Sequence, residues 1–396
     1  MSRNCARVLE VATIAGCLVL AVQVKSLSAQ ESKPAKAATD TSMSEEKAEK
    51  GKGPSFIPIP IFITEPAIGY GLGAALGYFH PRKGEPDVVA ESISPAFTSG
   101  TPPTQGTDKG KKRPPTISGV AVAYTENGTW GAGVGHSASW REDRMRYKGA
   151  LAYANVNSTF YYLDTPVDFN LKGGLLYQDL KLRIGSSDFW LGGRFSYMNA
   201  DSGLEQESDA GVDFGGDGIA DSGLAFAAIW DSRDNTMTPN HGQLIELVAW
   251  RYDEAIGGDF NYWKSEFKAL SFHQFSEKFV LGLRLDCNAV DGEPPFWSYP
   301  WITLRGVPAL RYQNDFAGAF ETELRWNLFT KWAVLAFAGV GATRGDTLIY
   351  EDESGIVAGG IGGRYLFRPE DDLWVGVDVA VGPEDAYAYI QVGHAW

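Results

Sequence analysis

Side chains along most of this chain alternate between apolar and polar with a period of two residues. In the segment DFAGAFETELRWNLF (315–329), Phe320 and Trp326 fall on one face, and Glu321 and Glu323 fall on the other. A period of two is that of a β-strand, because successive side chains of a strand point to opposite faces of a sheet. The alternation recurs to the last residue with no long helical pattern between the segments, so the sequence predicts an all-β fold.

About sixteen such segments can be counted back from the C-terminus, and bacterial single-chain barrels have an even number of strands. The predicted strands are residues 56–63, 68–79, 119–125, 130–139, 146–156, 171–184, 189–198, 224–231, 243–252, 260–272, 279–289, 316–329, 332–342, 355–367, 373–381 and 385–396. Residues 81–116, between the second and third strands, are rich in Pro, Gly, Thr and Ser, and we expect a disordered periplasmic insertion there.

Alternation alone fits two kinds of protein. In a water-soluble sandwich the charged face meets water, whereas in a membrane barrel the apolar face meets lipid and the charged face lines the lumen. The segment length favours the barrel, since a tilted strand needs ~9–11 residues to cross a bilayer. Trp and Tyr also gather near the predicted strand ends, as in the interface girdles of such barrels. The sequence therefore predicts a transmembrane antiparallel β-barrel of about sixteen strands.

The N-terminal part of the chain has a different composition. Residues 1–29 combine a positive start, an apolar run and small residues at the end, which is typical of a secretory signal peptide. The segment IAGC ending at Cys17 resembles a lipoprotein cleavage box, but the apolar run continues well past it. Residues 30–54 have almost no large apolar side chains and are expected to be a disordered periplasmic tether, which leaves 55–396 for the barrel.

Charge and cysteine usage exclude several functions. The net charge of −14 argues against a nucleic-acid partner, because no basic face is left over to neutralise phosphates. Cys287 is the one cysteine outside the N-terminal segment, so the mature chain has no internal disulfide and no zinc-type Cys/His cluster. The five histidines are scattered, and no Gly-x-Ser-x-Gly segment accompanies them. We therefore expect no catalytic, cofactor or metal site, and no enzyme.

Three motifs occur in an order that points to a known family. Leu304–Gly306 reads LRG and is followed by a strand with ETELRWNLF; WDSRDNTMTPNHG runs from Trp230 to Gly242; and the chain ends in GVDVAVGPEDAYAYIQVGHAW. From about residue 56 onward, the chain resembles the BamA/TamA-type superfamily of outer-membrane barrels, of the bacterial surface antigen type, which assemble or secrete proteins. The resemblance implies a Gram-negative outer-membrane location. It also implies that the long extracellular loop WITLRGVPALRYQND (301–315) folds back into the lumen.

The resemblance further implies that the loop arginine contacts the barrel wall, and we call Leu304, Arg305 and Gly306 the loop-lock motif. In the family this arginine commonly pairs with an Asp in an F-x-D-x-G stretch, but here that stretch reads FAGVG with Gly339 in place of the Asp. We therefore predict Glu323 as the carboxylate partner inside the lumen, with Glu321 and Asp378 as alternatives. The remaining alternative is that the loop arginine is merely solvated.

Two further groups of residues are assigned from the motifs. Asp231, Arg233, Asp234 and Gly242 are expected to form a tight periplasmic turn, because Asp and Gly suit turns and their side chains bond the local backbone. A catalytic role for these residues beside His241 is the weaker interpretation. Tyr389, Val392 and Trp396 are expected to form the terminal signal that outer-membrane assembly machinery recognises.

The expected function follows from the family resemblance and from the lack of room for a POTRA domain before the barrel. Family members usually carry periplasmic POTRA domains, and the short tether leaves no room for one. The favoured function is a barrel that inserts or exports a protein or lipid client, with an unidentified periplasmic partner supplying recruitment. Pro58 and Pro60 cannot donate to a strand ladder, so we expect a weak seam between the first and last strands. The alternative is a passive or plugged pore.

Overall fold

A computed structural model describes residues 55–80, 116–162, 165–204, 216, 218–236, 238–346, 352–368 and 373–396. The predicted signal peptide (1–29), the tether (30–54) and the insertion (81–116, except Thr116) lie outside these residues. The described residues form one antiparallel sheet of sixteen strands, in which each strand pairs with the next along the chain.

The strands are β1 (Ser55–Ile63), β2 (Gly71–Phe79), β3 (Ile117–Thr125), β4 (Trp130–Trp140), β5 (Met145–Tyr162), β6 (Thr165–Arg183), β7 (Phe189–Leu204), β8 (Ile219–Asp231), β9 (Gly242–Tyr252), β10 (Tyr262–Ser276), β11 (Phe279–Gly292), β12 (Phe316–Phe329), β13 (Trp332–Arg344), β14 (Ser354–Arg368), β15 (Leu373–Val381) and β16 (Ala386–Val392). The three helices among the described residues are single 3-10 turns: η1 (Pro66–Ile68), η2 (Glu254–Ile256) and η3 (Phe296–Ser298). No helix in this part of the chain is long and apolar enough to cross a membrane. The predicted fold class and strand number are confirmed.

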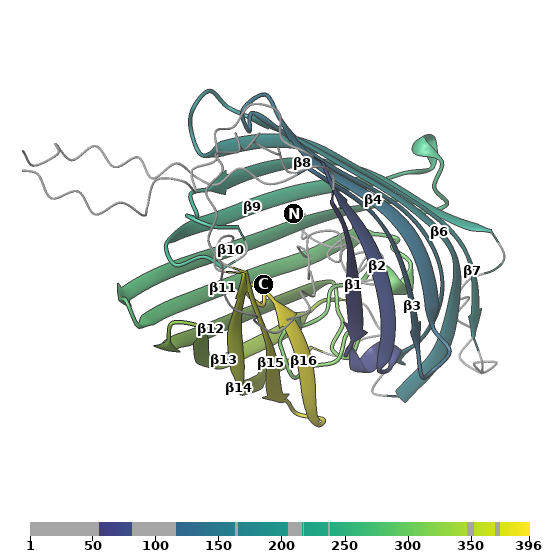
Figure 1. The fold of residues 1–396 in the computed structure, drawn as a ribbon. Coiled ribbons are helices and arrows are strands. Elements are labelled where there is room, and N and C mark those ends of the chain that lie inside the picture. Colours follow the sequence, from purple (N-terminus) through teal and green to yellow (C-terminus); the bar gives the residue numbers. More distant parts are fainter. Residues whose placement is uncertain are drawn as a thin grey trace, which may run out of the picture.

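The sheet curls into a nearly closed barrel (Figure 1). Along its strands, exposed apolar side chains alternate with buried polar ones. On β15, Val377 and Val379 are 51% and 48% exposed, whereas Asp378 between them is fully buried. On β12, Phe320 and Leu324 are exposed, whereas Glu321 is buried. This is the reverse of a water-soluble sheet, and it is the pattern expected when lipid surrounds the outer face.

Strand lengths differ from the predicted ones in two ways. β5, β6 and β7 span 18, 19 and 16 residues, because their pairing continues past the predicted ends as far as Tyr162 opposite Thr165. The last strand is shorter than the predicted 385–396 and ends at Val392. Gly393 follows with φ +83°, and its N–H donates to the carbonyl of Trp374 at 2.7 Å. This left-handed residue turns the final residues out of the sheet.

An even number of antiparallel strands places the start of β1 and the end of β16 at the same end of the barrel, which we call the terminal end. The opposite end is called the loop end. Within the described residues, β1 and β16 form no pair with each other, so the ladder runs from one to the other without closing. We call the line between these two strands the seam.

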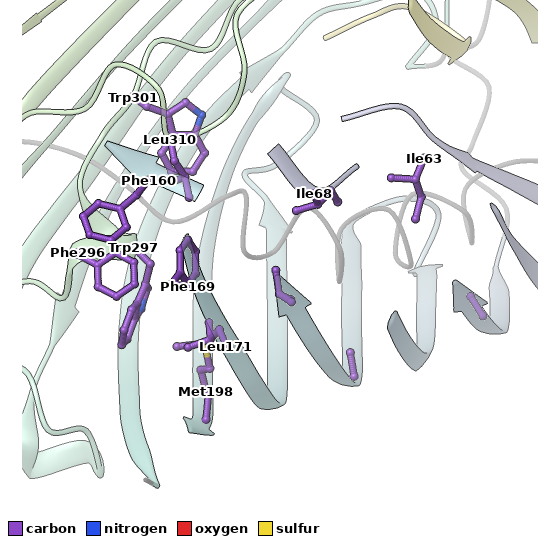
Figure 2. Close-up of a cluster of buried hydrophobic side chains, with 14 of the residues drawn as sticks. Ile63, Ile68, Phe160, Phe169, Leu171, Met198, Phe296, Trp297, Trp301 and Leu310 are labelled. Atoms are coloured by element: carbon purple, nitrogen blue, oxygen red, sulfur yellow. The ribbon is translucent and has the colours of Figure 1, made fainter. Parts of the chain in front are cut away.

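The lumen holds clusters of buried apolar side chains (Figure 2). The largest joins wall residues such as Phe160 and Phe169 to Phe296, Trp297 and Trp301, which belong to the segment between β11 and β12. This segment, residues 293–315, is called the lumen loop. Its aromatic side chains account for its position, since inside the barrel they are removed from water.

Candidate functional site

The lumen loop begins with an aromatic anchor against the wall. Phe296 packs on Phe160 of β5 at 4.6 Å and on Phe169 of β6 at 4.9 Å between ring centroids (Figure 2). Ser298 lies 3.2 Å from the hydroxyl of Tyr262, which donates to Asp221 at 2.8 Å. The first part of the loop is therefore held by apolar contacts with β5 and β6 and by a hydrogen bond to Tyr262 of β10, whose hydroxyl is in turn bonded to β8.

The second part of the loop is a small hairpin of its own. Trp301 and Gln313 form an antiparallel bridge, and the N–H of Ile302 donates to the carbonyl of Tyr312 at 3.1 Å. The N–H of Asn314 donates to the carbonyl of Pro300 at 3.0 Å. These bonds satisfy backbone groups that burial would otherwise leave unpaired. They also present the loop-lock motif on a backbone with a defined shape.

The FAGVG stretch of β13 provides the surface against which the motif packs. Gly339 faces the lumen, and a Cβ placed there would lie 2.6 Å from Cδ2 of Leu304. A Cβ placed on Gly341 would likewise be too close to the side chain of Ile302. Loop side chains thus occupy the space that side chains at these two glycines would need. The carboxylates that meet the arginine come from other strands.

Arg305 lies among all three predicted carboxylates. Its Nε donates to Oε1 of Glu321 at 2.7 Å, and Nη2 contacts the same oxygen. Its Nη1 lies 2.8 Å from Oε2 of Glu323 and 2.8 Å from Oδ2 of Asp378. Its guanidinium also stacks 3.5 Å from the ring centroid of Phe337. The arginine is 8% exposed, so it is not a solvated loop residue.

This arrangement differs from the predicted order of partners. The first choice was Glu323, yet Glu321 supplies the contacts through both Nε and Nη2. Glu321 and Glu323 both point inward from β12, whereas Asp378 reaches the arginine from β15. The arginine therefore links strands that do not pair with each other. Among the described residues, no group of three or more His, Cys, Asp or Glu side chains is arranged to hold a metal ion.

The sequence reasoning missed three side chains around this centre. Arg364 of β14 donates from Nη2 to Oδ2 of Asp378 at 2.9 Å. Arg284 of β11 lies 3.7 Å from Oε2 of Glu321. The indole N–H of Trp396 donates to Oε1 of Glu321 at 3.2 Å. Inward parity on their strands could have indicated the two arginines, but no sequence signal indicated that the C-terminal residue enters the lumen.

Gly306 allows the loop to approach the wall closely. Its φ is +97°, and a Cβ at this position would lie 3.1 Å from the carbonyl group of Val381. Both facts favour glycine, which has no side chain to clash in the left-handed region. The N–H of Gly306 donates to the hydroxyl of Tyr389 on β16 at 3.0 Å. The motif thus contacts the last two strands directly.

The loop also reaches the first hairpin, on the other side of the seam. The N–H of Ala309 donates to Oε1 of Glu65, which lies between β1 and η1, at 3.1 Å. Burial raises the pKa of Glu65, and the backbone bonds oppose that rise. Arg311 meanwhile pairs with Glu384, in the turn before β16, at 2.9 Å. The lumen loop therefore bridges two edges that have no ladder between them.

The residues assigned to the turn lie together at the terminal end, between β8 and β9. Arg233 pairs with Asp231 at 2.9 Å. Oδ1 of Asp234 accepts the backbone N–H groups of Asn240 and His241 at 3.0 and 3.2 Å. Gly242 begins β9 with φ +97°. These contacts are those of a turn, and its periplasmic position remains a prediction.

Of the three terminal-signal residues, two lie on β16 and one lies beyond its end. Tyr389 points inward from β16 to the loop. Val392 is the last residue of β16 and stands opposite Val375. The predicted terminal strand is wrong for Trp396, whose ring lies in the lumen 6.0 Å from that of Phe272. A Cβ on Gly282 would lie 2.8 Å from this indole, so the absence of a side chain there makes room for it.

Comparison with known proteins agrees with this architecture. Residues 123–296 match the family profile described as the Omp85 superfamily domain. This part of the chain is similar to the Omp85 superfamily domain. The resemblance read from the sequence is confirmed at this level. The matched region runs from within β3 to the start of the lumen loop, and a search of curated protein sequences gives no match.

Solved structures with this fold are distant in sequence. BamA from Haemophilus ducreyi lacking POTRA domains 1–3 is 9% identical with a TM-score of 0.56, over 86% of this chain and 70% of that one. CdiB from Escherichia coli is 11% identical with a TM-score of 0.57, over 87% of this chain and 63% of that one. CdiB from Acinetobacter baumannii is 9% identical with a TM-score of 0.52, over 86% and 59%. The chain thus spans less than two thirds of either CdiB.

Proposed function

We propose that this Omp85-type barrel resides in the outer membrane and inserts or exports a protein or lipid client through a lateral opening at the seam. The Omp85 β-barrel family is an outer-membrane family, and an apolar outer face suits that location. The terminal end would face the periplasm and the loop end the outside. The chain would reach this position with a cleaved signal peptide and with the help of outer-membrane assembly machinery.

The observation that carries the proposal is the unpaired seam. β1 and β16 are the two ends of the described ladder. β1 contains Pro58 and Pro60, and a proline removes one backbone donor wherever it occurs. Unpaired strand edges bind other strands readily. A client segment could therefore add to β1 or β16 by the same backbone bonds that hold the rest of the sheet.

The lumen loop would hold the seam in its resting state. It contacts Glu65 beside β1 and Tyr389 on β16. Arg305 joins the loop to Glu321 of β12 and to Asp378 of β15. Releasing the loop would both clear the lumen and remove the indirect link across the seam. Arg305 is thus proposed as the residue that couples the two events.

A plugged pore is the second candidate, and the buried loop favours it. Ile302, Leu304, Val307 and Tyr312 are buried together inside the barrel. A loop that fills the lumen would block a channel until it moved. In that case the seam would have no part in transport.

Cross-linking across the seam tests which function applies. Cys287 is first replaced by serine, because it is the one cysteine among the described residues. Phe62→Cys on β1 and Ile390→Cys on β16 then place two lipid-facing thiols on the two edges. Val377→Cys with Ile390→Cys is the matched control, since these residues are directly opposed within the β15–β16 ladder. Cells carrying each pair are treated with a flexible bis-maleimide.

The readout is the protein content of the outer membrane and culture medium, measured with and without cross-linker. We expect the seam pair to reproduce the protein losses seen in cells without the gene, whereas the control pair leaves the proteome unchanged. If the cross-linked seam leaves the proteome unchanged although deletion of the gene alters it, lateral opening is excluded and the pore is favoured.

A further inference from the structure

Two histidines and a serine form a hydrogen-bonded group on the outer surface of the barrel. Oγ of Ser118 lies 2.9 Å from Nε2 of His80 and 2.8 Å from Nδ1 of His136. Ser118 and His136 are directly opposed in the β3–β4 ladder, and His80 follows the last residue of β2. The group is thus fixed by the register of three adjacent strands. The two histidines lie 56 residues apart along the chain, so nothing in the sequence brings them together.

The group faces outward. Leu76, Val120 and Val134 share its side of β2, β3 and β4, and they are 43%, 50% and 50% exposed. Within the described part of the chain, the side-chain hydrogen bonds of Ser118, His80 and His136 join them to one another and not to the lumen loop. The function proposed above therefore makes no use of the group.

Aromatic side chains surround the group at the terminal end. The ring of Tyr78 lies 4.6 Å from that of His80, and the ring of Tyr147 lies 6.1 Å from that of His136. Trp140 stacks on Tyr147 at 5.8 Å. Such aromatic belts mark the boundary between hydrocarbon and headgroups, which is also the depth of the ester groups of lipids.

Proton counting shows what the group can do. A serine hydroxyl has one proton, and here two imidazole nitrogens approach the same oxygen. Both contacts are satisfied when one imidazole accepts that proton and the other donates its N–H to the oxygen, and the proposal uses this tautomer pair. The accepting ring is in the position of a general base, and the donating ring is a hydrogen-bond donor beside the reacting oxygen.

We propose that Ser118, His80 and His136 form a hydrolytic site for the acyl esters of glycerophospholipids in the membrane leaflet at the terminal end. The oxygen of Ser118 attacks the ester carbonyl carbon, and one imidazole takes its proton. The second imidazole donates a hydrogen bond to the developing oxyanion. The ester C–O bond then breaks, and the lysophospholipid oxygen takes the proton from the first imidazole.

Water completes the reaction. It attacks the acyl-serine carbon, loses a proton to the same imidazole and releases a fatty acid, and Ser118 regains its proton. The sum is phospholipid plus water giving lysophospholipid plus fatty acid. The proposal rests on the bilayer location proposed above but not on transport of a client, and its test uses no client.

The test uses the purified full-length barrel in mixed micelles of detergent and phosphatidylethanolamine. Fatty acid and lysophospholipid release is measured for the wild type and for Ser118→Ala, His80→Ala and His136→Ala. Ser137→Ala is the matched control, because it removes the neighbouring serine from the opposite face of β4. Heat-dependent gel mobility shows that each variant has folded. In parallel, hexadecylsulfonyl fluoride is used to label the nucleophile, and the labelled peptide is identified by mass spectrometry.

We expect Ser118→Ala to lower the release rate by about 100-fold or more, and each histidine variant to lower it by about 100-fold. The control should keep the wild-type rate, and the label should appear on Ser118. Absence of release by the wild type, or equal release by wild type and Ser118→Ala, overturns the proposal. Binding of phospholipid that depends on the group, without release or labelling, also overturns it and leaves a headgroup-binding site.

Discussion

Two arginines in the lumen each face three carboxylates, but they belong to different kinds of structure. Arg194 on β7 lies 3.5 Å from Asp179 and 3.7 Å from Glu266, and it also contacts Glu246. Asp179 is its direct partner in the β6–β7 ladder, and the other two carboxylates are on β9 and β10. We call this group the wall cluster, because all its members are wall residues whose strands are already fixed by backbone pairing.

The cluster around Arg305 is built differently, and we call it the loop cluster. Its arginine comes from the lumen loop, and its carboxylates come from β12 and β15, which do not pair with each other. The wall cluster therefore stabilises strands whose positions the backbone ladder already determines. The loop cluster instead holds the lumen loop, which pairs with no described strand of the barrel. This difference predicts that equivalent substitutions have different consequences.

The largest expected difference is in trypsin cleavage of the lumen loop, between Arg305→Ala and Arg194→Ala. Removing one partner of a buried ion pair costs about 3–5 kcal/mol, since charges are left unpaired. In Arg305→Ala the loop alone should be released, so trypsin should cleave after Arg311 about 100-fold faster or more, because each 1.4 kcal/mol is a factor of ten. Arg194→Ala should lower the unfolding temperature of the barrel but leave Arg311 protected. Equal protection of Arg311 in both variants would remove the contrast.

A smaller effect is expected from Gly306→Ala, compared with Gly355→Ala. Both glycines have positive φ, but a Cβ at Gly306 meets the backbone of β15, whereas a Cβ at Gly355 has nothing within 4 Å. Each alanine should cost about 1–2 kcal/mol for the left-handed backbone. Gly306→Ala should add a further penalty and expose the loop to trypsin. Similar cleavage of the two variants would show that close approach of the loop to β15 is unimportant.

Tyr389→Phe removes one hydrogen bond to the lumen loop, and Tyr387→Phe is its control. Tyr389 accepts the N–H of Gly306, whereas the hydroxyl of Tyr387 has no hydrogen bond within the described part of the chain. Losing the first bond should cost about 1 kcal/mol and speed amide exchange at Gly306 by roughly five-fold. The Tyr387 variant should exchange like the wild type. Unchanged exchange in Tyr389→Phe would mean that β16 does not hold the loop.

The smallest effect should be a pH dependence at the other side of the seam. Burial raises the pKa of Glu65 from its ordinary value of 4.5, so the folded state binds the proton more readily than the unfolded state. The stabilisation of the folded state by protonated Glu65 is therefore fully present below pH 4.5, and it is lost as the pH rises through the pKa of the folded state. Glu65→Gln should remove this loss, so amide exchange at Ala309 should vary less with pH than in the wild type. Identical pH profiles of exchange at Ala309 in the variant and the wild type would show that Glu65 does not control this contact.

The wall cluster and the loop cluster also show what the sequence could and could not predict. Period-two alternation predicted the strands and their inward faces, because every residue of a strand obeys the same geometry. It therefore indicated Glu321, Glu323 and Asp378 as lumen residues without any knowledge of the loop. The LRG motif then indicated which arginine to pair with them, through a family resemblance.

The rest depended on contacts between distant segments. Strand alternation cannot say that Trp396 leaves the sheet at Gly393, or that Glu321 is chosen over Glu323, because both are decided by three-dimensional packing. The His80–Ser118–His136 group was missed for the same reason. Its members carry no motif and meet only when β2, β3 and β4 are placed in register.

Single-channel conductance in planar bilayers tests the central claim, that Arg305 holds the lumen loop in place, most directly. Wild type, Arg305→Ala and Arg194→Ala would be compared in one salt and at one voltage. We predict that Arg305→Ala alone raises the conductance, because the loop no longer fills the lumen. An unchanged trace in Arg305→Ala, or an equal rise in both variants, would contradict the claim.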